Sequence, residues 1–130
     1  MGYRSQVRIV MPKKNFEELK ANCPKEIDYM FNGECVDIGY TEREVSLSNN
    51  QGEEEKAVIF GYNWVKWYDG YNDVDYINGY LRKLQEQNVP FKCVEVGEDG
   101  ATEEMCSDCL YDDKEYYDVI YGTYGIEEEV

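Results

Sequence analysis

The chain of 130 residues carries a formal net charge of −15 at pH 7, from 28 acidic and 13 basic side chains, and it contains no histidine. The missing histidine excludes the Ser-His-Asp and Cys-His arrangements of many hydrolytic enzymes, and the negative charge disfavours nucleic acid as a direct partner. An apolar content of 42%, with 15% aromatic residues, is too high for a disordered acidic tail and predicts a single folded domain over residues 1–130.

The N-terminal part is predicted to form a strand followed by a short helix. Apolar and polar residues alternate over Tyr3–Met11, which is typical of a strand, and Pro12 should end it. Asn15 lies three residues before Glu18, in the order of a capping box, and indicates a helix start. Pro24 should end or bend that helix.

The middle of the chain is predicted to hold strands and the clearest helix. Two short strands are expected at Glu34–Tyr40 and Glu44–Ser48, and the longest strand at Lys56–Tyr68. Both faces of Lys56–Tyr68 are largely apolar, which is typical of a strand in the interior of a sheet. Asn72 then predicts the N-cap of a helix. The apolar face of this helix recurs at three- and four-residue steps: Val74, Ile77, Leu81, Leu84.

The C-terminal part is predicted to be mainly strand. Phe91–Val96 should form a strand that ends in the turn Gly97–Gly100, and a polar excursion over Ala101–Asp113 should lead to a last strand at Glu115–Tyr124. Two helices among mainly antiparallel strands indicate an α+β two-layer sandwich, of which a ferredoxin-like variant is one form.

The cysteines indicate reduced thiols. There are five, an odd number, and the sequence shows neither a secretory segment nor an apolar run of membrane-spanning length. Cys106-Ser107-Asp108-Cys109 has the C-x-x-C spacing that can supply half of a zinc site. Because only one such pair is present, and nearby carboxylates raise the pKa of a thiol, we expect free thiols with no metal or other cofactor.

The acidic residues concentrate in the C-terminal third. From Val94 onward 13 acidic residues stand against one base, Lys114, whereas residues 1–25 hold six bases and two acids. Solubility of a small domain needs a net charge of only about 2 to 8, so the excess suggests a basic protein as the partner. The expected partner-binding residues are the acids of the segment 98–113: Glu98, Asp99, Glu103, Glu104, Asp108, Asp112, Asp113.

Three segments carry a resemblance to a known group of proteins. Met1–Ser5 (Met-Gly-Tyr-Arg-Ser), Lys66–Gly70 (Lys-Trp-Tyr-Asp-Gly) and Val94–Asp99 (Val-Glu-Val-Gly-Glu-Asp) resemble small acidic proteins encoded in bacteriophages and prophages. The resemblance implies a phage origin and action in the host bacterial cytoplasm. It implies no activity.

Two functional hypotheses follow. The first is a non-enzymatic phage-encoded inhibitor of a host defence protein, an anti-CRISPR or similar anti-defence protein, whose acidic surface mimics nucleic acid in a basic groove. The alternative is an accessory phage protein that binds a small molecule, or a metal through Cys106 and Cys109. We expect no enzyme, because the sequence shows no pair of a nucleophile and a base. A third reading leaves the charge with no role beyond solubility.

Overall fold

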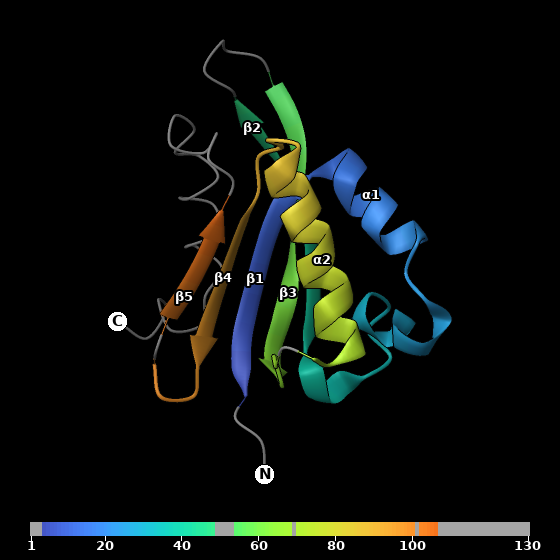
Figure 1. Ribbon diagram of the computed structural model, residues 1–130, viewed down its shortest axis with the longest axis vertical. Helices are drawn as coiled ribbons and strands as arrows, with labels where there is room; N and C mark the ends of the chain where they lie inside the picture. The colour runs from blue at the N-terminus through green and yellow to red at the C-terminus, as the bar shows by residue number, and fades with distance from the viewer. Residues whose placement is uncertain (1–3, 49–53, 69, 101, 107–130) are drawn as a thin grey trace.

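A five-stranded antiparallel sheet forms one layer of the protein, and two α-helices cover one of its faces (Figure 1). The computed structural model describes residues 4–48, 54–68, 70–100 and 102–106. The strands are β1 Ser5–Pro12, β2 Tyr40–Ser48, β3 Glu54–Val65, β4 Lys92–Gly97 and β5 Thr102–Cys106. The helices are α1 Lys13–Ala21 and α2 Asn72–Glu86, with 3-10 turns η1 Lys25–Met30 and η2 Val36–Ile38.

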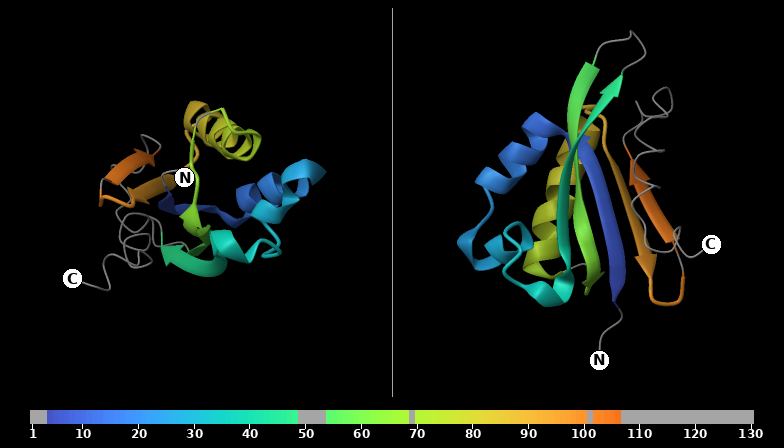
Figure 2. Two further views of the ribbon diagram at one scale, coloured as in Figure 1. Left: turned by 90° about the horizontal axis from the view of Figure 1, so that it is seen from below. Right: turned by 180° about the vertical axis from the view of Figure 1, so that it is seen from behind.

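The strand order is β2-β3-β1-β4-β5, and each neighbouring pair is antiparallel. Figure 2 shows both helices on the same side of this sheet. The predicted α+β two-layer sandwich is therefore confirmed. With the 3-10 turns left aside, the elements β1-α1-β2-β3-α2-β4, in the sheet order β2-β3-β1-β4, make the ferredoxin-like arrangement of two interleaved βαβ units. β5 extends the sheet beyond β4.

The core lies between the sheet and the helices. β3 is an interior strand, as its apolar faces predicted, and it places Val58, Phe60 and Tyr62 on the helix-covered face. The four predicted apolar residues of α2 are all buried: Val74, Ile77, Leu81, Leu84. Apolar burial of this kind stabilises a fold by roughly 25 cal/mol per Å².

Truncating Leu81 to alanine is expected to lower the free energy of unfolding by about 2–5 kcal/mol, because the side chain is completely buried and its loss leaves a cavity. The neighbouring Arg82 is exposed, so Arg82→Ala should change stability by less than about 0.5 kcal/mol. Urea unfolding of both variants measures the difference. Equal stability of the two variants would show that α2 does not pack as described.

Several predicted boundaries are wrong. Glu34–Tyr40 is not a strand, because the 3-10 turn η2 and the left-handed conformation of Gly39 (φ 63°) precede β2. β2 is then one continuous strand that begins at Tyr40. Part of the polar excursion is a strand, β5, held by its pairing with β4. The expected strand Glu115–Tyr124 lies outside the described residues.

The predicted helix caps are also wrong. α1 begins at Lys13, directly after Pro12, so Asn15 lies inside the helix. Asn72 is the first residue of α2 and Tyr71 holds the N-cap position, with no side-chain cap hydrogen bond. The acids of the first turn, Asp73 and Asp75, lie where they favour the helix dipole.

A β-bulge in β3 redirects the end of that strand. Ser5 pairs with Val65 and Val7 pairs with Tyr62, so two steps along β1 match three along β3. The extra residue brings Val65 to the same buried, helix-covered face as Tyr62, although the two residues are three positions apart and would face opposite sides of a regular strand.

Arg8 holds the bulge together. This side chain is only 6% exposed, and its guanidinium donates hydrogen bonds to the carbonyl oxygens of Val7 (2.9 Å) and Tyr62 (3.1 Å) and to Oδ1 of Asn63. A planar guanidinium with five donors suits such a cluster of acceptors. Arg8 is therefore a structural residue in the described part of the chain.

Candidate functional site

The structure brings four of the seven predicted partner-binding residues together on the β4–β5 hairpin. Glu98 and Asp99 are exposed in the turn, and Glu103 and Glu104 are exposed on β5. Among the strands that the structure describes, β5 is the outermost on this side of the sheet (Figure 1). The other three predicted residues, Asp108, Asp112 and Asp113, lie outside the described residues.

Two of these carboxylates take part in structural contacts. Oε1 of Glu98 accepts a hydrogen bond from the backbone N–H of Arg4 at 2.6 Å, and the backbone N–H of Glu98 donates to the carbonyl of Arg4 at 3.1 Å. Oε2 of Glu104 lies 3.4 Å from Nζ of Lys92, whose side chain is fully buried. Glu104 therefore compensates a charge that would be costly to bury alone. Sequence reasoning missed the burial of Lys92.

Glu103 has a different environment from Glu104. Successive strand residues face opposite sides of a sheet, so the two carboxylates point away from each other. Glu103 pairs across the strands with Glu95, another acid. Like charges placed opposite one another destabilise a sheet slightly. The cross-strand pairing of Glu103 with Glu95 therefore adds no attraction between opposite charges to the sheet.

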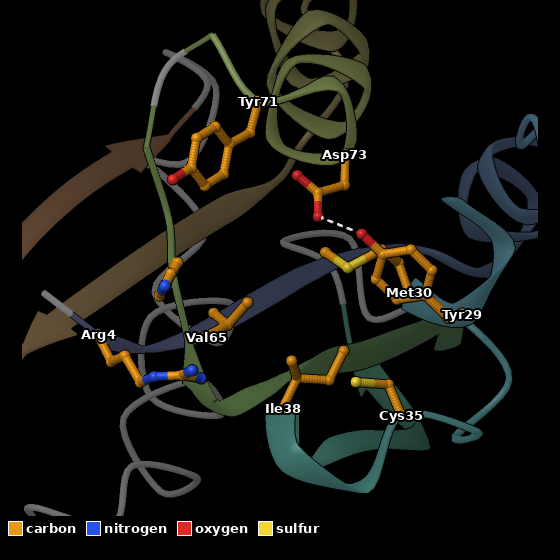
Figure 3. A pocket seen from close by; sticks show the side chains of 9 residues that line it. Arg4, Tyr29, Met30, Cys35, Ile38, Val65, Tyr71 and Asp73 are labelled. Atoms are coloured by element: carbon orange, nitrogen blue, oxygen red, sulfur yellow. Dashed lines mark hydrogen bonds between the residues drawn. The ribbon is translucent and has the colours of Figure 1, made fainter. Parts of the chain in front are cut away.

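A second feature is a pocket of about 440 Å³ at the N-terminal end of α2 (Figure 3). It lies where the end of β3, the start of β1, the 3-10 turns η1 and η2 and the first turn of α2 meet. We call it the α2 pocket. Its apolar lining includes Met30, Ile38 and Val65, and its polar lining includes Arg4, Lys66 and Asp73.

A tyrosine–aspartate hydrogen bond forms one wall of the α2 pocket. The hydroxyl of Tyr29 donates to Oδ2 of Asp73 at 2.7 Å, and the backbone N–H of Val74 donates to Oδ1 at 2.7 Å. Burial, followed by this hydrogen bond, raises the pKa of Tyr29 to about 12. Tyr29 is therefore a neutral donor at physiological pH, and it ties η1 to α2.

Arg4 supplies a positive charge on the opposite wall. Its Nη1 donates to the carbonyl oxygen of Trp64 at 3.1 Å, and Figure 3 shows the side chain directed across the pocket toward Ile38. Lys66 lines the same pocket two residues after Trp64. Among the described residues that line it, the pocket has two cations and one carboxylate, in a chain with a net charge of −15.

Sequence reasoning did not identify the α2 pocket. Its lining residues come from five separate segments, and no motif joins them. One signal was present. Arg4 and Lys66 belong to two of the three segments on which the expectation of a phage protein rests, and Glu98, which binds Arg4, belongs to the third.

The cysteines of the described part are free thiols: Cys23, Cys35, Cys93, Cys106. Burial, with a smaller effect of Glu95, raises the pKa of the Cys93 thiol, and burial also raises that of Cys23. Cys109 lies outside the described residues. Within the described ranges, no group of three or more Cys, Asp or Glu side chains is placed to hold a metal ion.

The chain matches no protein-family model, and no curated protein or solved structure is significantly similar to it. In the part of the chain that the structure describes, no helix has the length and apolarity needed to cross a membrane.

Proposed function

We propose that this protein is a non-enzymatic, phage-encoded inhibitor that acts in the host bacterial cytoplasm on a basic, nucleic-acid-handling defence protein, in the manner of an anti-CRISPR or a similar anti-defence protein. The observation that carries the proposal is the asymmetry of charge. Residues from Val94 onward have a net charge of −12, and the described acids of this segment gather on the β4–β5 hairpin.

Ion pairs at the other edge of the sheet support this assignment. Lys13 and Lys20 of α1 lie 2.7 Å and 3.1 Å from Glu44 and Glu42 of β2, and Lys56 of β3 also pairs with Glu44. The bases of the N-terminal part thus offset acids of β2. The described part of the C-terminal negative charge lies on the β4–β5 hairpin, where it would turn that hairpin toward a basic groove during encounter.

Capture at two salt concentrations tests the proposal. Immobilised protein should retain a nucleic-acid-binding protein from a bacterial lysate at about 50 mM salt and release most of it at about 500 mM, because screening shortens the range of charge interactions severalfold. The purified partner should then lose its nucleic acid when this protein is added. Capture that does not respond to salt, or a partner that keeps its nucleic acid, would contradict the proposal.

The alternative function, an accessory phage protein that binds a small molecule or a metal, is favoured by one observation, the α2 pocket. The metal form of this alternative depends on Cys109 as well as Cys106, and so on residues outside the described ranges. The small-molecule form has a described cavity with both charged and apolar walls.

A further inference from the structure

We propose that the α2 pocket binds a small organic anion, a carboxylate or phosphate group carried on a flat apolar body. This inference goes beyond the proposed inhibitor and does not depend on it. It rests on the volume of the cavity, on its apolar walls, and on two cations that the fold places beside it.

The size and the walls of the cavity suit an apolar body. A volume of about 440 Å³ lies within the range of small-molecule sites. Met30 is fully buried beneath the pocket, and Val65 and Ile38 are only 3% and 8% exposed, so the floor of the pocket belongs to the core. The ring of Tyr71, 46% exposed, also lines the pocket and offers an aromatic face for stacking.

The polar groups select the charge of the ligand. Arg4 uses one guanidinium nitrogen to bind the carbonyl of Trp64, and its planar fork has further donors that suit a carboxylate or phosphate. Lys66 adds a second positive charge. The carboxylate of Asp73 accepts hydrogen bonds from Tyr29 and from the backbone of Val74. These hydrogen bonds fix Asp73 in the wall, and its negative charge stands against the two positive charges of Arg4 and Lys66, so the described charged residues of the lining keep a net positive charge that favours an anion.

The pocket is built by the fold before any ligand arrives. The bulge in β3 brings Val65 to the buried face, the Tyr29–Asp73 hydrogen bond joins η1 to α2, and Arg4 is tied through its backbone to Glu98. Preorganised walls of this kind reduce the entropy lost on binding.

The test uses three aromatic probes of similar shape with the full-length protein: 2-naphthoate, 1-naphthyl phosphate and the neutral 2-naphthamide. Calorimetry and amide NMR shifts should show that at least one anion binds with shifts around the α2 pocket, and at least about tenfold more tightly than the amide, as expected for a charge-assisted hydrogen bond. The two anions distinguish a carboxylate ligand from a phosphate ligand.

Variants of Arg4 and Lys66 test whether these two side chains bind the anion. Arg4→Gln combined with Lys66→Gln should weaken binding of the anion by about tenfold or more, whereas Lys14→Gln combined with Arg82→Gln makes the same change of net charge at exposed sites away from the pocket and should leave binding unchanged. If the loss of Arg4 disturbs the fold, the single variants Lys66→Gln and Lys66→Arg replace the double one, and the arginine variant should retain binding. No binding of either anion at about 5 mM, equal binding of the amide, or full binding by the folded pocket variant would overturn the proposal.

Discussion

Replacing Gly61 with alanine is expected to remove at least about 3 kcal/mol of stability and to leave little folded protein. A Cβ on Gly61 would lie 1.9 Å from the carbonyl oxygen of Val7 and 2.9 Å from its carbonyl carbon. Real Cβ atoms do not approach other atoms so closely, and the atoms in the way are backbone, which cannot rotate aside. Overpacking of well-packed sites costs about 1–3 kcal/mol even where side chains can move.

The position of Gly61 in the sheet increases the cost. β1 is the central strand of the described sheet and β3 is the interior strand beside it, and Gly61 pairs with Arg8 next to the bulge. Moving the strands apart would weaken backbone hydrogen bonds worth about 1 kcal/mol each and the contacts of the Arg8 guanidinium. The close approach and the bulge are thus parts of one local arrangement.

Gly79 provides the matched control. It lies in α2, and a Cβ added there would meet no atom within 4 Å. Gly79→Ala should therefore stabilise the protein by up to about 1 kcal/mol, because alanine is the better helix former. Urea unfolding of the two variants measures the change in the free energy of unfolding. The same Gly→Ala substitution should lower it at position 61 and raise it at position 79. A Gly61→Ala protein as stable as the wild type would show that β1 and β3 do not pair in this register.

The parts of the fold that the sequence predicts are those with strong local periodicity. The apolar residues on both faces of β3 identify an interior strand, and the spacing of Val74, Ile77, Leu81 and Leu84 identifies α2. β5 has no such pattern, since Thr-Glu-Glu-Met-Cys alternates weakly, and its extended conformation depends on pairing with β4. Tertiary pairing of this kind cannot be seen in a local window of sequence.

In the candidate sites too, features that depend on nearby residues were predictable and features that depend on tertiary structure were not. The acids of the β4–β5 hairpin are close in sequence, so their proximity in space was predictable. The ion pair of Glu104 with buried Lys92 was not, because it needs the strand register and the burial of the sheet face. The α2 pocket gathers Arg4, Tyr29 and Asp73 from distant segments, which only the assembled sheet brings together.

Reversing acids of the segment 98–113 is expected to slow association with the nucleic-acid-handling partner by about tenfold or more and to flatten its salt dependence, because electrostatic steering contributes such factors to association rates. Acids that make structural contacts are left unchanged in the test variant. Glu98 and Glu104 stay, since they bind Arg4 and Lys92. The test variant replaces Glu103, Asp112 and Asp113 with lysine.

The control makes the same change of charge on the helical layer. Glu17, Glu26 and Glu86 are exposed there, and replacing them with lysine also raises the net charge from −15 to −9. Both variants are expected to stay folded, since Glu103 and the three control acids are exposed and such charges contribute about 1 kcal/mol or less each. Stopped-flow association rates at several salt concentrations then show whether the rate depends on where the acids lie or only on the net charge of the protein.

The comparison of the two variants distinguishes a directed surface from a merely acidic protein. If the β5 side enters a basic groove, the test variant should lose most of its rate advantage and the control should keep most of it, since screened charges act mainly within about 10 Å at 0.1 M salt. An equal loss in both variants would mean that the net charge alone attracts the partner, and no loss in either would mean that the acids serve another purpose. Either outcome would contradict an acidic hairpin that occupies the nucleic-acid groove of its target.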